Sequence, residues 1–148
     1  CALPILNDAG VVRYPRFHII VEDPATGLTH EWQIGTRATS TLYETQGIQV
    51  PAELRAAADR LGKHFRADIH DIEYDVFQAF AKKQPEVAAE LGIPGFIGRV
   101  AEASQRSAAG SADTELSADL AQLHAEAARL LQALVDRRGA DEIAGLFH

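Results

Sequence analysis

Two strand-forming segments joined by a tight polar turn constrain the fold of this chain more than any other feature, and they occupy residues 14–36. Residues 17–21 form a run of β-favouring side chains, and residues 28–34 alternate apolar and polar side chains with a period of two. Between them, Pro24 fixes one φ and Gly27 can adopt a positive φ. The pattern predicts an antiparallel β-hairpin.

The length of the turn decides which side chains share a face of this hairpin. With a four-residue loop, His18 lies opposite Gln33 and Ile20 lies opposite Glu31. One more loop residue would place His18 opposite Trp32, on the other face. The four-residue register therefore predicts a polar face that contains His18, Glu31 and Gln33. The alternative interpretation is an ordinary hairpin with one solvated face and no site.

Length and composition indicate one globular domain. The chain has 148 residues, of which 47% are hydrophobic and 24% are charged. No apolar run reaches the roughly 20 residues of a membrane span, and the start does not resemble a signal peptide, so we expect a cytoplasmic protein without a membrane partner. The single cysteine, Cys1, excludes an internal disulfide, and a first residue other than Met indicates a processed or excised chain.

The charge distribution bears on the kind of ligand. A net charge of −7 argues against non-specific binding to duplex DNA, which normally requires a basic surface. Arg13, Arg16 and Arg37 nevertheless lie close to the hairpin in the sequence. A local cationic surface on an acidic protein suits a small phosphorylated ligand better than a duplex.

Apolar periodicity and the positions of Gly and Pro predict the remaining elements. A strand before residue 12 would extend the hairpin to a three-stranded antiparallel sheet. Helices are predicted over residues 37–46, 51–61, 64–77 and 86–91. In the third of these helices His70 and Tyr74 are four residues apart and therefore neighbours on the polar side. Residues 92–98 are predicted to form a loop anchored by Phe96 and Ile97.

The C-terminal third is predicted to be a flexible segment followed by a long amphipathic helix. Residues 101–113 are small, polar and aperiodic, whereas leucines recur at spacings of three and four from residue 115 to residue 137. The overall prediction is an α+β fold with a domain over 1–100, a flexible loop over 101–113 and a C-terminal helix over 114–148. That helix either packs on its own domain or forms a homo-oligomer contact.

Three segments taken together resemble the RelA/SpoT-like (p)ppGpp synthetases. Residues 14–18 (YPRFH) are similar to the Tyr-x-x-x-His segment of that family, and residues 30–36 (HEWQIGT) are similar to its Glu-x-Gln-x-Arg-Thr strand. Residues 67–74 (ADIHDIEY) resemble its helix with His-x-x-x-Tyr. Pro15 and Gly35 stand where the family has arginines, and residues 1–13 contain no counterpart of its ATP-binding half.

The resemblance implies transfer of pyrophosphate from ATP to the 3′-hydroxyl of a purine nucleotide, with Mg²⁺ as cofactor. Glu31 would be the general base and a metal-associated carboxylate, and Tyr14 would stack on the acceptor base. A ribose hydroxyl is a poor nucleophile until a carboxylate or a metal takes its proton, and the phosphates require cations. The other candidates for substrate binding are Arg16, His18, Gln33, Arg37, His70 and Tyr74.

The resemblance also bears on partners. The expected acceptor is GDP, GTP or ADP, and the 3′ end of tRNA fits an acidic chain less well. Toxin-type members of the family act in a target-cell cytoplasm and are paired with an antitoxin or immunity protein. The rival interpretation is a non-catalytic nucleotide-binding or protein-interaction module that docks through the leucine-striped helix. The six histidines show no recognised zinc spacing.

Overall fold

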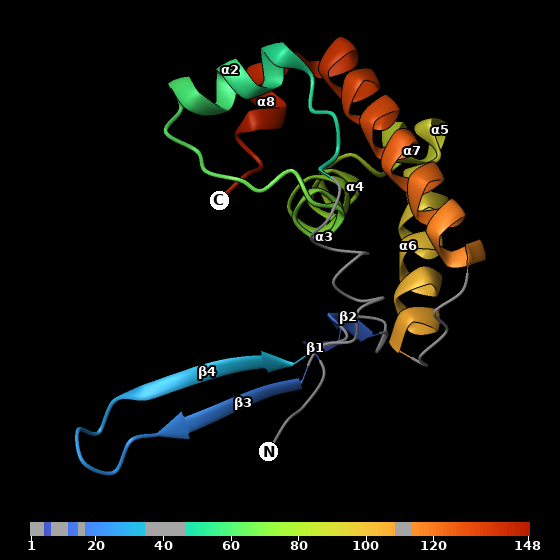
Figure 1. Ribbon diagram of the computed structural model, residues 1–148. Coiled ribbons are helices and arrows are strands. Elements are labelled where there is room, and N and C mark those ends of the chain that lie inside the picture. Colours follow the sequence, from blue (N-terminus) through green and yellow to red (C-terminus); the bar gives the residue numbers. More distant parts are fainter. Residues whose placement is uncertain (1–4, 7–11, 15–16, 35–46, 109–113) are drawn as a thin grey trace.

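The computed structural model describes residues 5–6, 12–14, 17–34, 47–108 and 114–148. Four short strands precede a set of helices, so the fold is α+β, as predicted (Figure 1). The strands are β1 (Ile5–Leu6), β2 (Val12–Tyr14), β3 (Phe17–Glu22) and β4 (Thr29–Ile34). The helices are α2 (Ala52–Arg60), α3 (Ile69–Asp71), the π-helix η1 (Ile72–Gln78), α4 (Ala79–Lys83), α5 (Pro85–Leu91), α6 (Ile93–Ala108), α7 (Thr114–Arg138) and α8 (Ala140–Ala144).

In the described part of the chain the strands form two separate antiparallel pairs. β1 pairs with β2, with Ile5 opposite Tyr14 and Leu6 opposite Val12, and β3 pairs with β4 along its whole length. The prediction of a three-stranded sheet is wrong, because β1 pairs with β2, which follows it after a short connection, and not with a strand of the hairpin.

The hairpin turn is held by a compact set of hydrogen bonds around Asp23. The Asp23 N–H donates to the Leu28 carbonyl at 2.8 Å, and the Gly27 N–H donates to the Asp23 carbonyl at 2.8 Å. The Asp23 carboxylate accepts from the Ala25 N–H at 2.9 Å and from the Thr26 hydroxyl at 2.7 Å. These bonds lower the pKa of Asp23. Gly27 has a φ of 69°, which glycine adopts at no steric cost. The turn is therefore a four-residue loop.

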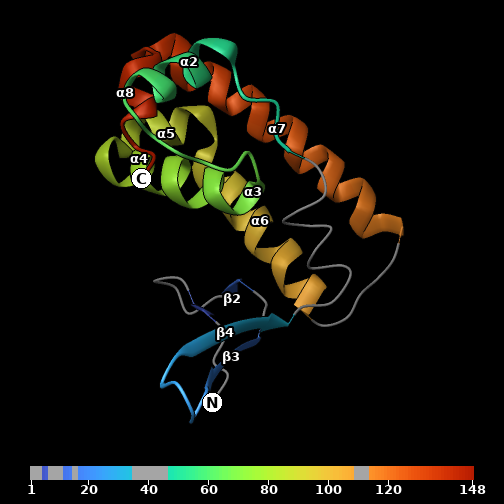
Figure 2. The ribbon, with the colours of Figure 1, turned by 60° about the vertical axis from the view of Figure 1, so that its left-hand side comes forward.

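The helices pack around the continuous helical rod formed by α3, η1 and α4 (Figures 1 and 2). No side chain from residue 69 to residue 81 is exposed. Phe77 on this rod packs edge-to-face against Phe96 of α6, with ring centroids 5.2 Å apart. α2 packs against α8, and α6 against α7. The largest fully buried side chains are Leu54, Ile69, Ile72, Phe77, Phe80, Ile93, Phe96, Leu130, Leu131, Leu134 and Phe147.

Helix boundaries differ from the prediction at two places before residue 80. α2 buries Leu54 and ends at Arg60, before Gly62, which has a φ of 64°. The predicted helix continued to Leu61, which lies beyond α2 and is 48% exposed. The next helix begins at Ile69 and not near residue 64, because the Asp68 side chain caps it. Phe65 lies outside the helix, stacked on Phe147 with centroids 4.1 Å apart. The predicted helix over 37–46 lies outside the described residues.

The predicted loop over 92–98 is wrong, because this segment opens α6. Gly92 has a φ of 77° and ends α5, and α6 begins at the next residue. Pro94 falls in the first turn of α6, where its missing N–H costs nothing. Phe96 is fully buried, as predicted, but from a helix. Residues 101–108 are the second half of α6 and not a flexible loop, while 109–113 lie outside the described residues.

The long C-terminal helix is confirmed as α7, and its leucine stripe is buried against its own chain. Leu120, Leu123, Leu130, Leu131 and Leu134 are all 5% exposed or less. α6 and α8 pack against α7, so the stripe is covered within the chain, and a homo-oligomer contact through this helix stays a prediction. None of the helices in the described residues combines the length and the apolar composition needed to cross a membrane.

Candidate functional site

The β3–β4 hairpin brings three of the predicted site residues to one face. Its register places His18 opposite Gln33 and Ile20 opposite Glu31, which is the register of the four-residue loop and not that of the loop with one more residue. Directly opposed residues of an antiparallel pair lie on the same face, and so do residues two apart on one strand. His18, Glu31 and Gln33 therefore occupy neighbouring positions on one face, which also includes Glu22 at its turn end.

The other predicted site residues are placed elsewhere or not described. Tyr14 ends β2, opposite Ile5, and two residues separate it from the start of β3. Arg16 and Arg37 lie outside the described residues. His70 and Tyr74 lie on the helical rod, in α3 and η1, and both are half-buried. The candidate site on the described residues thus consists of a hairpin face and a separate helix terminus.

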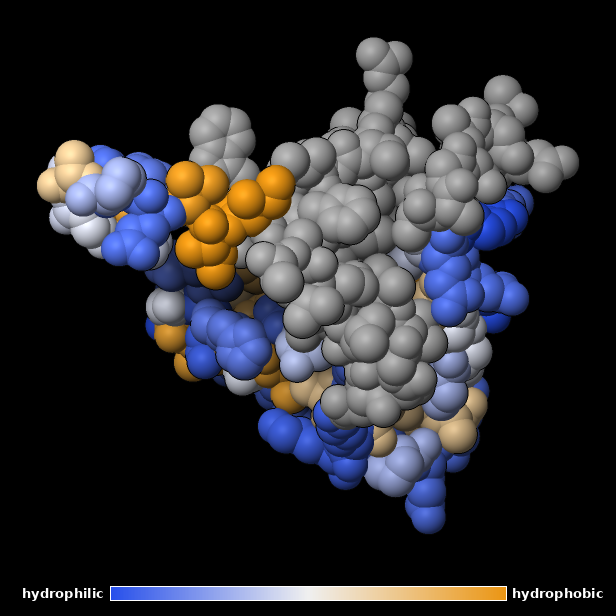
Figure 3. All heavy atoms as spheres, turned by 90° about the horizontal axis from the view of Figure 1, so that it is seen from below, coloured by the Kyte–Doolittle hydropathy of each residue, from blue (hydrophilic) through white to orange (hydrophobic). Residues whose placement is uncertain are grey.

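The hairpin projects from the helical body and is open to solvent (Figure 1). Ile20 is 72% exposed and Leu28 is 62% exposed. Ile19 and Val21, on the opposite face, are also exposed. Figure 3 shows apolar surface on this arm beside the polar turn. The hairpin therefore offers both of its faces to a ligand or a partner near the turn.

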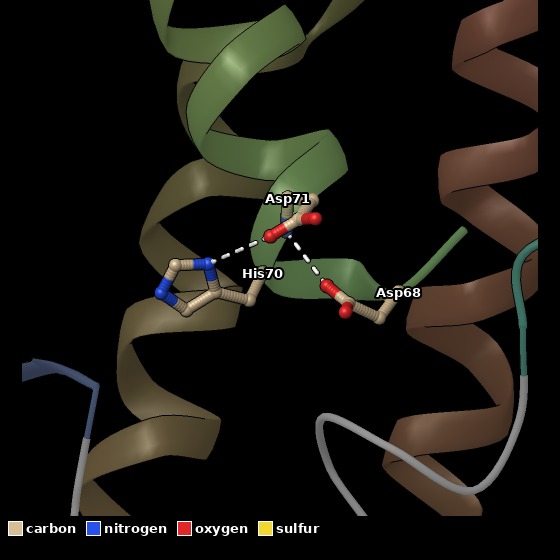
Figure 4. A group of neighbouring side chains, drawn as sticks. All are labelled: Asp68, His70 and Asp71. Carbon is tan, nitrogen blue, oxygen red and sulfur yellow. Dashed lines mark hydrogen bonds and ion pairs between the residues drawn. The ribbon is translucent and has the colours of Figure 1, made fainter. Parts of the chain in front are cut away.

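The second cluster is at the N-terminus of the helical rod, where Asp68, His70 and Asp71 lie together (Figure 4). The Asp71 N–H donates to the Asp68 carboxylate at 2.8 Å, the usual helix-capping bond. The His70 Nδ1 lies 3.5 Å from Oδ1 of Asp71, and the Arg66 Nε lies 3.3 Å from Oδ2 of Asp71. This arrangement gathers two carboxylates, an imidazole and a guanidinium.

The two carboxylates of this cluster titrate in opposite directions. The hydrogen bond from His70, reinforced by Arg66, lowers the pKa of Asp71 to about 2. Burial raises the pKa of Asp68, against the hydrogen bond from the Asp71 N–H. The half-buried Asp71 is therefore a firmly ionised anion, and Asp68 is the carboxyl of the cluster that takes up a proton more readily.

This cluster is the candidate metal site among the described residues. Each of Asp68, His70 and Asp71 offers one ligand atom, and these atoms lie within 4.8 Å of one another. Mg²⁺, however, prefers six oxygen ligands, and an imidazole nitrogen does not suit it. The carboxylates already cap the helix and pair with Arg66. Helix capping therefore accounts for the cluster without a metal, and the residues do not fit Mg²⁺ in particular.

The helical rod contains a buried polar pair that the sequence interpretation missed. Glu73 is 7% exposed, and Gln78 donates to its Oε1 from Nε2 at 2.6 Å. In an α-helix, residues five apart do not share a face. In the π-helix η1, where each backbone bond spans five residues, they do. An α-helical periodicity therefore could not indicate this pair. Its one signal in the sequence is a Glu followed five residues later by a Gln.

A polar groove lies between α6 and α7, with a volume of about 480 Å³. Ion pairs cross it, because Arg99 binds Glu126 and Arg106 binds Asp119. Each guanidinium on the groove wall is thus matched by a carboxylate from the facing helix. This balance favours a structural role in holding α6 to α7 over the binding of phosphates, which would require an excess of cations.

No protein-family model, curated protein or solved structure matches this chain. The functional interpretation therefore depends on the residues and their geometry. Of the two clusters described above, the capped helix terminus is accounted for by the stability of the fold. The hairpin face is the other cluster, and its strand register brings His18, Glu31 and Gln33 to neighbouring positions.

Proposed function

We propose that this chain is a RelA/SpoT-like nucleotide pyrophosphokinase domain, whose hairpin binds the acceptor nucleotide. The observation that carries the proposal is the β3–β4 register, which places His18 and Gln33 opposite each other and Glu31 two positions away on the same face. The family resemblance assigns these same residues to one pocket. A different loop length would have separated His18 from the other two.

The proposed reaction is an attack of the acceptor 3′-oxygen on the β-phosphorus of ATP. A bond forms between that oxygen and the β-phosphorus, the bond from the β-phosphorus to the α,β-bridging oxygen breaks, and AMP leaves. The proton of the hydroxyl passes to the Glu31 carboxylate, which acts as general base. His18 and Gln33 supply hydrogen-bonding groups on the same face to orient the ribose or phosphates. Tyr14 provides the stacking surface for the purine.

Magnesium fits this proposal at the hairpin better than at the helix terminus. Mg²⁺ in such sites is usually held by one or two carboxylates together with the substrate phosphates. Glu31 would supply the protein carboxylate, on the same face of the hairpin as the largely exposed Ile20. When bound, the ion would neutralise charge that develops on the transferred phosphates.

The direct test is a transfer assay with the whole chain. The chain is incubated with Mg²⁺, labelled ATP and, in separate reactions, GDP, GTP, ADP or tRNA, and the products are separated by chromatography. We expect a purine nucleotide to accept the label. Glu31→Gln keeps the shape of the side chain but removes the base, so we expect the rate to fall by about 10²-fold or more.

The matched control is Glu86→Gln, the same change of charge at an exposed position of α5. It should leave the transfer rate unchanged. Binding of each nucleotide is measured in parallel by calorimetry, because acceptor binding does not require turnover. A chain that neither transfers pyrophosphate nor binds any of the nucleotides would contradict the proposal.

The exposed apolar side chains of the hairpin favour a second candidate, a protein-interaction module without catalysis. Ile20 and Leu28 are largely exposed, and exposed apolar side chains on a projecting arm are typical of contact surfaces. Under this alternative, the cognate antitoxin or immunity protein is one suitable partner. Loss of partner binding in Leu28→Lys, with nucleotide binding absent in the unmodified chain, would favour this candidate.

A further inference from the structure

Among the described residues, the outer edge of β3 is an unpaired edge of extended backbone. In the described residues β3 pairs only with β4, and the pair stands alone as a two-stranded ladder. In both ribbon views β3 lies on the side of β4 that faces away from the helices (Figures 1 and 2). Isolated two-stranded hairpins are marginally stable, and unprotected edges are ready sites for a further strand.

The hydrogen-bond pattern identifies which backbone groups this edge presents. Asp23 and Leu28 form a hydrogen-bonded pair next to the turn, with the Asp23 N–H 2.8 Å from the Leu28 carbonyl. Hydrogen-bonded and non-hydrogen-bonded pairs alternate along an antiparallel ladder. The N–H and C=O groups of His18, Ile20 and Glu22 therefore point outward from the hairpin, where an added strand would meet them.

We propose that the outer edge of β3 pairs antiparallel with the β3 edge of a second copy of this chain. With Ile20 opposite Ile20 of the second copy, the three outward-pointing residues of one strand meet the three of the other. Ile19 then lies opposite Val21, and His18 lies opposite Glu22, on each side of the two-fold axis. The strand FHIIVE is thus complementary to itself in hydrogen bonding and in apolar side chains, with an imidazole position opposite a carboxylate position at each end.

The exposure of the apolar side chains agrees with this pairing. Ile19, Ile20 and Val21 are 40%, 72% and 47% exposed in the single chain. Cross-strand pairs of β-branched residues stabilise a sheet, and pairs of opposite charge add to it. Edge strands normally carry lysine, proline or a β-bulge that prevents pairing with another chain. β3 has none of these within Phe17–Glu22. The result is a four-stranded sheet, which is large enough to be stable.

The first test is the oligomeric state of the full chain, measured by sedimentation velocity from about 1 to about 100 μM. We expect a dimer that dissociates on dilution. Ile20→Pro removes an N–H that points outward, so it breaks the contact between copies without removing a bond between β3 and β4. We expect this variant to weaken the dimer at least 10-fold.

The matched control is Thr29→Pro. Thr29 lies opposite Glu22, so its N–H also points outward, but from the outer edge of β4. This variant should dimerise like the unmodified chain. A chain that is monomeric throughout the concentration range would overturn the proposal. So would a dimer that survives Ile20→Pro, or one that Thr29→Pro disrupts instead.

The second test fixes the register. In the Cys1→Ser background, Ile20→Cys places two thiols opposite each other in a hydrogen-bonded pair, where the Cα atoms are about 5.5 Å apart and a disulfide can form. We expect Ile20→Cys to cross-link under mild oxidation and Ile19→Cys to remain uncross-linked. The reverse result would overturn the register. Neither test requires a nucleotide, so the dimer can fail or hold independently of the proposed catalytic function.

Discussion

The helical body and the hairpin arm of this protein differ in how they are held together. The body buries its large apolar side chains almost completely, with Phe77, Phe96 and Phe147 at 1% exposure or less. The arm exposes Ile19, Ile20, Val21 and Leu28 and is held by a two-stranded ladder and a hydrogen-bonded turn. Because a protein opens locally where few apolar groups are buried, the body supplies the stability and the arm supplies an adaptable surface.

The largest expected effect is in the body. Phe77→Ala removes a fully buried ring that packs edge-to-face against Phe96, so we expect the free energy of unfolding to fall by about 3–5 kcal/mol. Urea denaturation followed by circular dichroism measures this loss. An effect below about 1 kcal/mol would show that the helical rod is not the centre of the core.

The buried polar pair of the rod should have the next largest effect. Gln78→Ala removes the 2.6 Å hydrogen bond to the buried Glu73 side chain, and removing one partner of a buried hydrogen bond costs about 1–3 kcal/mol. We expect a loss of that size in denaturant unfolding at pH 7. In the double variant that also carries Glu73→Gln, Gln78→Ala should cost clearly less. Equal losses in both backgrounds would mean that the pair does not act as a unit.

The cluster at the N-terminus of α3 should make the free energy of unfolding depend on pH in the acidic range. The folded pKa of Asp71 is about 2, below the ordinary value of 3.8, so its contribution is fully present above about pH 4 and is lost as the pH falls toward 2. Asp71→Asn should therefore cost about 1 kcal/mol at pH 7, allowing for solvent screening, and almost nothing at pH 2.

Unfolding of Asp71→Asn and the unmodified chain across this pH range measures the difference. Asp68, whose pKa is raised, contributes the opposite slope, because its folded state takes up the proton more readily. A loss in Asp71→Asn that stays constant from pH 7 to pH 2 would contradict the assigned ion pairs.

The smallest effect is expected in the arm. Leu28 is 62% exposed, so Leu28→Ala should change the free energy of unfolding by less than about 0.5 kcal/mol. Hydrogen exchange provides the companion measurement, since the amides of β3 and β4 should exchange much faster than those of η1. Protection of the arm equal to that of the rod, at dilutions where the chain is monomeric, would remove the distinction between the two regions.

The sequence predicted the parts of the fold that depend on local pattern. The period-two run of residues 28–34 and the turn at Asp23 predicted the hairpin with two possible registers, and the leucine spacing predicted α7. The start of α6 was missed, because Gly92 and Pro94 are typical of loops but here end one helix and begin the next. Which helix covers which face depends on tertiary packing, and no local pattern encodes it.

The candidate site likewise has one part that the local sequence pattern predicts and another that it does not. Residues on one hairpin can be brought together by register alone, so the neighbourhood of His18, Glu31 and Gln33 was predictable once the loop was taken to have four residues. The pairing of Glu73 with Gln78 was not, because it requires a π-helical turn. The contact of His70 with Asp71 could have been predicted, because the two residues are adjacent in the sequence. The ion pair of Arg66 with Asp71 could not, because Arg66 lies before the helix and its position depends on the path of the chain there.

A nucleotide titration of the isotopically labelled chain, observed by amide NMR, tests directly whether the hairpin binds the acceptor. With GDP, GTP or ADP in the presence of Mg²⁺, we predict chemical-shift changes concentrated in β3 and β4, with the amides of α6 and α7 unchanged. The same titration of Glu31→Gln shows how far that carboxylate contributes to binding. Changes centred on the α6–α7 groove, around Arg99 and Arg106, or no changes with any nucleotide, would contradict the assignment of function to the hairpin.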